Sequence, residues 1–568
     1  MQSDFFKYFL FGVAALLVFM LLRQWNDFSS EYEKQISPSK RSVSEASYSG
    51  EQNFSGSSVE QRDLLSGAPD ANNTVKKTNN NLTQYIKAET DNLRVTIDKR
   101  GGDIVKVELL KHKKSLDEPS LPFVLLEKDV RNYYARSGLQ KPNDNTKRFY
   151  SSDQNYYKLE QGGEFSFDLS YIEAGGVELI KRFTLKKDDY LIDVDHFIKN
   201  NDSVDWSGFF FANIIRDASP APGSENAAFG IQSFLGAATT TAEKKYKKIS
   251  FDDMRKERLN SLHSGGWVAM LQHYFVSAWI PKDKENFNYY TKVYDTTPSL
   301  YSIGLNKRLS VKPGEKIHVA TQFYAGPKDQ YRLEKISPNL NLTVDYGWLW
   351  MIAQPLYTLL YFFATGQANL FGESYNVFSG VGNWGLAIIL LTLVIKGVFF
   401  QLSAKSYKSM ANMRRVQPKL IAIKEQYGGD KQAQSKAMME LYKKEKINPL
   451  GGCFPILIQM PVFIALYWAL MESVVLRHAP FMLWIEDLSV MDPYFLLPFM
   501  MGATMFIQQK LNPAPPDPMQ AKIMQWMPVV FTFFFIFFPA GLVIYWVSNN
   551  ILSIAQQWYI TKKIEQSS

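Results

Sequence analysis

Residues 384–403 read WGLAIILLTLVIKGVFFQLS, and this stretch decides how the second half of the chain folds. A helix that crosses the hydrocarbon core of a bilayer needs about 20 mainly apolar residues, and this stretch supplies them with one charge, Lys396. A charged side chain inside such a helix costs about 2.5–3.5 kcal/mol on insertion, so it usually has a function or a route to water. Lys396 lies about 18 Å beyond Trp384 at helical rise, which is past the midplane of the bilayer. The sequence thus predicts a membrane span with a cation that is either functional or extended toward the headgroups.

Three further stretches in the second half are long, apolar and free of charge: 451–471, 493–509 and 523–561. As one helix, the last would be about 58 Å long, nearly twice the thickness of the hydrocarbon core. We therefore predict that it forms two spans, which turn at Pro539, Ala540 and Gly541.

The N-terminal residues contain another apolar stretch, 8–22, between Lys7 and Arg23. A cleaved signal peptide ends in small residues, whereas this stretch runs into large and charged side chains. The sequence favours an uncleaved anchor over a signal peptide, and either one would export the residues that follow.

The segment 401–450 fixes the expected topology because it has 11 basic residues against 4 acidic ones, a net charge of +7. Basic loops remain cytoplasmic, and this loop would lie outside if the uncharged stretch 346–364 also crossed the membrane. We therefore expect 346–364 to lie in the outer interface, where its aromatic residues are typical and where Pro355 is tolerated. These aromatic residues are Tyr346, Trp348, Trp350, Tyr357 and Tyr361. Six spans with both termini in the cytoplasm result.

The basic segment itself predicts two antiparallel helices. Apolar residues recur at spacings of three and four from Met410 to Tyr427, Gly428 and Gly429 follow, and Asp430 can cap a second helix. The positive face of this pair is explained by the tendency of basic loops to stay in the cytoplasm. Alternatively, it also provides a docking platform for ribosomes or acidic polypeptide.

The segment between the first two spans predicts a flexible tether followed by an all-β domain. Residues 29–81 are polar and have few large apolar side chains, which is typical of disorder. From Leu93 onward apolar and polar residues alternate around turns such as Gly101 and Gly102, as in antiparallel hairpins. We predict an antiparallel β-sandwich to about residue 335.

Composition excludes several classes of function. The 568 residues carry a net charge of +8, which the basic loop explains without nucleic-acid recognition, and the single cysteine, Cys453, cannot form an internal disulfide. The histidines of the β region are scattered and indicate no catalytic or metal site: His112, His196, His263, His273 and His318. Gly380, Gly382 and Gly385 spell GxGxxG, but without the strand that a dinucleotide site requires. We predict no enzyme activity, no metal and no cofactor.

Polar side chains recur in the spans near Lys396. Thr392 lies one turn away on the same face, Gln459 lies within the stretch 451–471, and Tyr545 and Asn549 share one face of the last span. Such side chains face one another or water rather than lipid. They indicate a wet, cationic cavity in the cytoplasmic half of the bundle, or amides that only join helices.

Four longer motifs are specific: GGWVAMLQHYF (265–275), GNWG (382–385), NPLGGCFPILIQMPVF (448–463) and DPMQAKIM (517–524). On these motifs, the chain resembles the YidC family of membrane protein insertases of Gram-negative bacteria over essentially its whole length. The resemblance implies a polytopic α-helical membrane protein with six spans, a five-helix core and an all-β periplasmic supersandwich domain. It also implies a hydrophilic groove that opens to cytoplasm and lipid but is closed to the outside.

The resemblance implies site residues as well. The family's groove has a basic residue, usually Arg, at the position of Lys396, and Lys keeps the charge without the planar donor fork. Thr392, Gln459 and Asn549 would supply polarity, and Met460, Phe463, Tyr545 and Trp546 would supply apolar contacts. Implied partners are nascent membrane proteins, the Sec translocon with its accessory subunits, the ribosome through 404–450, and membrane lipids. The stretch 369–380 is longer than is usual in the family.

Two other functions remain open from the residues alone. A transporter of a small anion would use Lys396 as its binding charge, although no internal repeat is visible. A structural or glycan-binding protein would act through its β domain.

The expected domains follow in chain order: an inner-membrane anchor (1–23), a periplasmic tether (24–85), the β-supersandwich (86–335), an interfacial helix with its connection (336–383), span two (384–403), the cytoplasmic hairpin (404–450), span three (451–471), a periplasmic loop (472–492), span four (493–509), a cytoplasmic loop (510–522), span five (523–538), span six (541–560) and a cytoplasmic tail (561–568).

Overall fold

The alternating residues after Leu93 form the predicted hairpin. In the computed structural model, β2 (Leu93–Asp98) pairs antiparallel with β3 (Asp103–Lys113), which brings Leu93 opposite Leu109 and Val95 opposite Val107. These four side chains are buried. The turn is made by two glycines with positive φ, Gly101 and Gly102, a conformation in which a Cβ atom is strained.

The structure describes residues 84–144, 146–160, 162–222, 233–241, 244–370, 373–445, 454–512 and 518–567. The chain divides into two compact units, 1–62 with 229–231, and 63–228 with 232–568. Every described residue belongs to the second unit. The predicted anchor and all but the last two residues of the tether lie outside the described residues.

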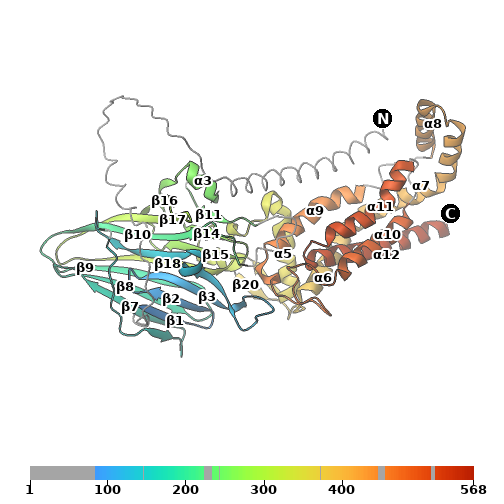
Figure 1. The fold of residues 1–568 in the computed structure, drawn as a ribbon. Helices are drawn as coiled ribbons and strands as arrows, with labels where there is room; N and C mark the ends of the chain where they lie inside the picture. The colour runs from blue at the N-terminus through green and yellow to red at the C-terminus, as the bar shows by residue number, and fades with distance from the viewer. Residues whose placement is uncertain are drawn as a thin grey trace, which may run out of the picture. The chain divides into compact units, whose positions relative to one another are not determined.

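Two large sheets make up the β domain (Figure 1). The first has ten strands in the order β13-β16-β17-β10-β5-β3-β2-β1-β6, with β4 beside β3. Its other strands are β1 (Tyr85–Glu89), β4 (Pro122–Glu127), β5 (Tyr134–Gln140), β6 (Tyr156–Lys158), β10 (Trp206–Asp217), β13 (Asn260–Ser264), β16 (Asn286–Tyr294) and β17 (Leu300–Val311).

The second sheet has eight strands in the order β12-β11-β14-β15-β18-β9-β8-β7. They are β7 (Glu164–Ile172), β8 (Val177–Lys186), β9 (Leu191–Asn200), β11 (Gly236–Thr239), β12 (Lys247–Ile249), β14 (Val268–Leu271), β15 (Phe275–Pro281) and β18 (Lys316–Pro327). The antiparallel prediction is wrong for one pair, because β1 and β6 are parallel. A long connection precedes β6, and parallel pairing requires such a crossover.

The inner faces of the two sheets meet in a sandwich. Trp279 of β15 donates its indole N–H to the Asn213 carbonyl of β10, 3.1 Å away. Lys181 of β8 reaches the Ser137 carbonyl of β5 at 2.9 Å and the Gly102 carbonyl at 2.6 Å. The predicted β-rich domain is therefore confirmed, with a charged side chain that joins the layers.

Short helices flank the sheets, and longer helices follow them. The short ones are α2 (Lys128–Arg131), α3 (Phe251–Lys256), α4 (Gln330–Ile336), η3 (Leu340–Thr343), η4 (Gly347–Leu349) and η6 (Val474–Leu476). The longer ones are α5 (Trp350–Thr365), α6 (Trp384–Val398), α7 (Phe400–Gln426), α8 (Lys431–Lys444), α9 (Phe454–Met471), α10 (Leu496–Leu511), α11 (Pro518–Phe535) and α12 (Ala540–Ser567). Helix α12 packs against α6, α7, α9 and α10.

Helix boundaries follow the prediction in part at one place and differ at another. The predicted division of 523–561 into two helices is seen, but the connection covers 536–539 rather than 539–541, because α11 ends at Phe535 and α12 already begins at Ala540. The stretch 384–403 is not one helix: it breaks at Phe399, where α6 and α7 meet at 67°. Gly397 precedes the break and weakens the helix there.

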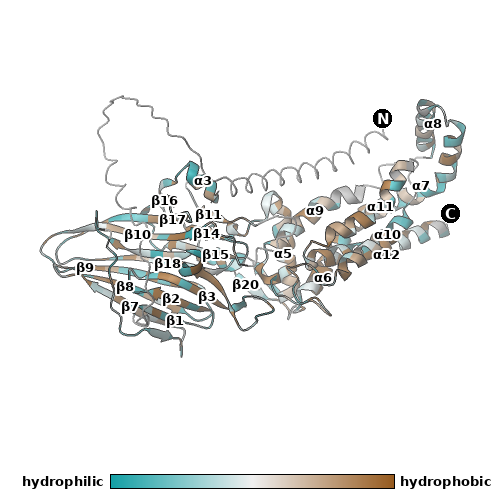
Figure 2. Cartoon of the chain, in the orientation of Figure 1, coloured by the Kyte–Doolittle hydropathy of each residue, from teal (hydrophilic) through white to brown (hydrophobic). Residues whose placement is uncertain are grey.

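Apolar colouring predominates on α6, whereas α8 shows polar and apolar colours side by side (Figure 2). Among the described residues, no helix taken alone is both long and apolar enough to cross a membrane. The bent pair of α6 and α7 meets the length and composition requirements together. The count of six spans stays a prediction.

Helix α5 contradicts part of the prediction for its aromatic residues. Trp348 is 77% exposed and Trp350 is exposed as well, but the rings of Tyr346 and Tyr357 are buried. Tyr346 donates its hydroxyl to Gln330 Oε1 at 2.8 Å, so this tyrosine packs within the protein rather than at an interface. The two tyrosines are buried because of tertiary packing, which the periodicity of the sequence does not reveal.

The long stretch after α5 contains a hairpin that the sequence did not predict. Strands β19 (Gln367–Leu370) and β20 (Glu373–Asn376) pair antiparallel. The amides of Val377 and Phe378 then donate to the Gly366 carbonyl, which fixes the hairpin to the end of α5.

Candidate functional site

Lys396 lies near the C-terminal end of α6 and is half-buried. Its ammonium group donates to Ser553 Oγ on α12 at 2.7 Å. Among the residues that the structure describes, no carboxylate forms an ion pair with this lysine. Within that part of the chain, the lysine is therefore held by a neutral partner.

Ser553 is a site residue that the sequence reasoning missed. Its hydroxyl donates to the Asn549 carbonyl one turn earlier, at 2.7 Å, and its lone pairs remain free to accept from Lys396. The spacing of four residues along Tyr545, Asn549 and Ser553 could have revealed it, because such residues share one helix face.

A second polar cluster joins α9 to the same face of α12. The amide of Gln459 donates to Asn549 Oδ1 and lies 3.4 Å from the Tyr545 hydroxyl. The structure thus brings together four residues that are polar and come from three helices: Lys396, Gln459, Tyr545 and Asn549.

Thr392 is not part of this polar cluster, in which Tyr545 and Asn549 are themselves buried. Its side chain is fully buried, and its hydroxyl donates to the Ile388 carbonyl within α6 at 2.7 Å. A threonine hydroxyl has one hydrogen to donate, and that of Thr392 is used within its own helix. The polarity that the sequence assigned to Thr392 is therefore not exposed.

Two further amides of α12 serve as joints between helices. Asn550 donates to Thr504 Oγ1 of α10 at 3.1 Å, and Gln557 donates to Asn512 Oδ1 at 3.0 Å. For these two residues the simpler interpretation, hydrogen bonding between helices, is sufficient.

An aromatic cluster borders the polar one. The Phe463 ring meets the Trp546 ring edge-on at 4.7 Å, and Phe535 of α11 lies 5.1 Å from the same ring. Met460 is exposed on α9. The predicted apolar residues therefore adjoin the polar cluster.

The segment 472–492 closes one end of these helices. Asn383 caps α6 and also donates to the Phe481 carbonyl at 2.7 Å. The amide of Ala540, the first residue of α12, donates to the Val490 carbonyl at 2.7 Å. The ring of Phe481 occupies the space where a Cβ atom of Gly385 would lie, so the glycine permits this close contact. The segment is thus tied to both α6 and α12.

The opposite end of the helices carries the predicted two-helix hairpin. Asp430 caps α8 by accepting from the amides of Gln432 and Ala433, as its position predicted. Val416 and Leu420 of α7 form a small core with apolar residues of α8, namely Met438, Leu441 and Tyr442. The basic surface therefore stands on a packed helical pair.

The described part of the β domain offers no comparable constellation. Within the described ranges, no three His, Cys, Asp or Glu side chains are grouped as metal ligands would be. His196 is buried without a hydrogen-bond partner, and burial lowers its pKa well below the ordinary value. His196 is thus a core residue, and the absence of catalysis in this domain stays a prediction.

Two families match the chain. The family described as "60Kd inner membrane protein" matches residues 376–567, and "YidC periplasmic domain" matches residues 85–359. Among curated relatives, the "Membrane protein insertase YidC" of Alcanivorax borkumensis is 51% identical over 496 residues, which are 86% of this chain and 85% of that protein. That of Cellvibrio japonicus is 46% identical over 577 residues, 99% of each chain. Among solved structures, an active YidC insertase with its first transmembrane domain resolved has a TM-score of 0.38 and 17% identity, and the match covers 85% of this chain and 93% of that one.

Proposed function

Because this chain belongs to the YidC family of membrane protein insertases, we propose that it inserts client membrane proteins into the inner membrane through a hydrophilic, cationic groove between its helices. The relatives are named insertases, so the work is the physical transfer of a polypeptide and not a covalent reaction. The observation that carries the proposal is Lys396, whose only described polar partner is Ser553 Oγ, beside the cluster of Gln459, Tyr545 and Asn549.

The proposed topology has six spans. The first lies at 1–23, the others follow α6, α9, α10, α11 and α12, and the β domain and the segment 472–492 lie in the periplasm. Both termini and the basic pair α7–α8 then lie in the cytoplasm, as the net charge of +7 in 401–450 favours. Helix α5, which begins with the exposed Trp350 and is preceded by the exposed Trp348, lies in the outer interface.

Insertion begins when the acidic flank of a client enters the groove from the cytoplasm. Two opposite unit charges 4 Å apart attract by about 4 kcal/mol at an effective dielectric of 20, before the cost of desolvation is subtracted. The unpaired ammonium of Lys396 supplies this attraction. Gln459 and Asn549 can hydrogen-bond the polar backbone of the client within the membrane. This lowers the cost of its entry, because an unsatisfied polar group in hydrocarbon costs several kcal/mol.

The apolar segment of the client leaves sideways into lipid. We expect it to slide along α6 and α10 while Met460, Phe463 and Trp546 provide apolar contacts. Burial of apolar surface in lipid drives this step. The hydrogen bonds that tie 472–492 to α6 and α12 favour a groove that is closed on the periplasmic side.

Further partners follow from the family. We propose that the chain acts alone or beside the Sec translocon and its accessory subunits. The basic surface of α7 and α8 suits contact with a ribosome, because ribosomal RNA is anionic.

The test is insertion of a small single-span client with an acidic flank into vesicles that contain this purified chain as their only protein. Protease protection measures the inserted fraction, and protein-free vesicles give the background. Protection above background that requires the acidic flank supports the proposal. Protection equal to background overturns the proposal. It is also overturned if a client whose acidic residues are replaced by amides is protected as well as the acidic client.

Deletion of about residues 90–330 separates this function from one that resides in the β domain. Insertion that persists, even at a lower rate, supports the helical core as the working part. Complete loss, in a protein whose helices remain folded, supports the β domain instead.

A further inference from the structure

A buried ion pair joins the β domain to the helix that carries Gln459. Lys328 follows the last residue of β18, and Glu472 follows the last residue of α9. Their ammonium and carboxylate groups lie 2.5 Å apart, and the side chains are only 3% and 6% exposed. Neither residue has a role in the function proposed above.

Further hydrogen bonds complete the surroundings of Glu472. Its other carboxylate oxygen accepts from the Ser233 hydroxyl at 2.9 Å, and His273 donates a ring N–H to the neighbouring Met471 carbonyl at 2.9 Å. Burial would raise the pKa of Glu472, but the charge of Lys328 and its hydrogen bond hold that pKa below the ordinary value. Both carboxylate oxygens of Glu472 therefore have hydrogen-bond partners.

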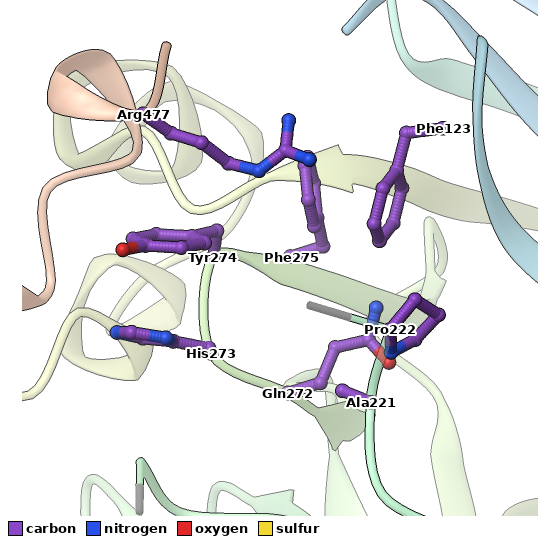
Figure 3. A pocket seen from close by; sticks show the side chains of 8 residues that line it. All are labelled: Phe123, Ala221, Pro222, Gln272, His273, Tyr274, Phe275 and Arg477. Carbon is purple, nitrogen blue, oxygen red and sulfur yellow. The ribbon is translucent and has the colours of Figure 1, made fainter. Parts of the chain in front are cut away.

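Arg477, five residues further along the chain, makes a second attachment to the β domain. Its guanidinium donates to the Lys113 carbonyl at 2.9 Å and to the Lys114 carbonyl at 3.0 Å. It also lies over the rings of Phe123 and Phe275, at 5.2 and 5.9 Å from their centres (Figure 3). Such an arrangement fixes direction as well as distance, since planar donors and stacked rings tolerate little rotation.

We propose that Lys328, Glu472 and Arg477 form a latch that holds the end of α9 against the β domain and thereby positions the client-contact residues of that helix. Gln459 and Phe463 lie 13 and 9 residues before Glu472, about 20 and 14 Å along a continuous helix. A helix clamped at one end transmits the orientation of that end along its length. Lys328 and Glu472 are thus positioning residues, and this role rests on the proposed insertase function.

The ion pair of Lys328 and Glu472 is better explained by the orientation that it imposes on α9 than by the stability that it adds. Replacing a buried ion pair by apolar side chains of similar size is often neutral or stabilising, whereas removing one partner leaves an uncompensated charge. Lys328→Met alone should therefore weaken docking roughly 100-fold, and Lys328→Met with Glu472→Leu should restore it.

The experiment uses the full chain in vesicles with Cys453 replaced by serine and spin labels at Val130→Cys and Leu483→Cys, two positions that are exposed in the structure. Electron–electron resonance gives the distance distribution between the β domain and the segment after α9. Insertion of the acidic-flank client is measured on the same preparations. Arg182→Met is the matched control, because it breaks an exposed ion pair with Asp168.

We expect one narrow distribution for the unsubstituted protein and for Arg182→Met. Lys328→Met should broaden it and slow insertion about 2- to 30-fold, and the apolar pair should reverse both changes. A narrow distribution in Lys328→Met refutes the latch, and a broad one with an unchanged insertion rate refutes its positioning role. The proposal is also overturned if the broad distribution and the slow insertion persist when Lys328→Met is combined with Glu472→Leu. If the unsubstituted chain inserts nothing, the proposed function fails, while the distances still decide whether the latch exists.

Discussion

The substitution Lys181→Met tests the role of the buried lysine that joins the two sheets of the β-sandwich. Lys181 is completely buried on β8 and donates to the carbonyls of Gly102 and Ser137. Burial lowers its pKa from 10.5 to about 7, although the nearby charge of Asp103 opposes the shift. Methionine has a similar length and no charge, so it removes the titration while it fills much of the same space.

The pH dependence follows from the two pKa values. Below pH 7 the lysine is protonated in the folded and the unfolded state, and the penalty for burying the charge is fully present. Between pH 7 and 10.5 the unfolded state binds more protons, so the free energy of unfolding rises with pH by about 1.4 kcal/mol per unit. From pH 7.5 to 9.5 the unsubstituted domain should gain about 2–3 kcal/mol relative to Lys181→Met.

Urea unfolding of the full chain in detergent, followed by circular dichroism of the β-sheet at pH 7.5, 8.5 and 9.5, measures this difference. Lys114→Met, at an exposed position, is the matched control and should parallel the unsubstituted protein. Tyrosines with raised pKa values, such as Tyr150 at about 12, titrate above this window and are common to all variants. Equal slopes for the unsubstituted protein and Lys181→Met would show that the reasoning about this lysine is wrong.

Three shorter predictions concern the helices. Lys396→Arg should keep the insertion rate, whereas Lys396→Glu should lower it about tenfold because a carboxylate repels an acidic client; equal protease protection in both variants would remove the charge hypothesis. Gly385→Ala should lower the thermal midpoint in detergent, because the new Cβ overlaps the Phe481 ring, and the added substitution Phe481→Ala should recover part of the loss; no such recovery would point to another cause. Asp430→Ala should destabilise α8 by about 1 kcal/mol, seen as faster amide exchange in that helix, while Asp430→Asn retains the cap; identical exchange in both would contradict the capping role.

Local patterns were sufficient for elements whose own residues specify them. The hairpin around Gly101 and Gly102 and the cap at Asp430 appear where the sequence predicts them, and the helix break before Ala540 lies a few residues before its predicted place. Each depends on contacts between residues that are close in the chain, and such contacts leave a periodic or punctuated trace in the sequence.

Other features could not be read from the chain. Thr392 has a periodicity compatible with a groove, yet its hydroxyl is bonded within its own helix. The helix break at Phe399 and the burial of Tyr346 depend on neighbours that the sequence does not identify. In each case one side chain has several satisfactory environments, and packing selects among them.

The sequence by itself determined the class of the molecule: a polar β domain, apolar helices with a single charge at Lys396, and a basic helical pair. Only the tertiary structure decided that Lys396 meets Ser553, that Gln459 meets Asn549, and that Lys328 meets Glu472. Hydrophobicity and charge are sums over neighbouring residues, so they can be read directly from the sequence. The pairing of two polar groups 90 to 157 residues apart is set by the geometry of packed helices and sheets, which the linear order does not contain.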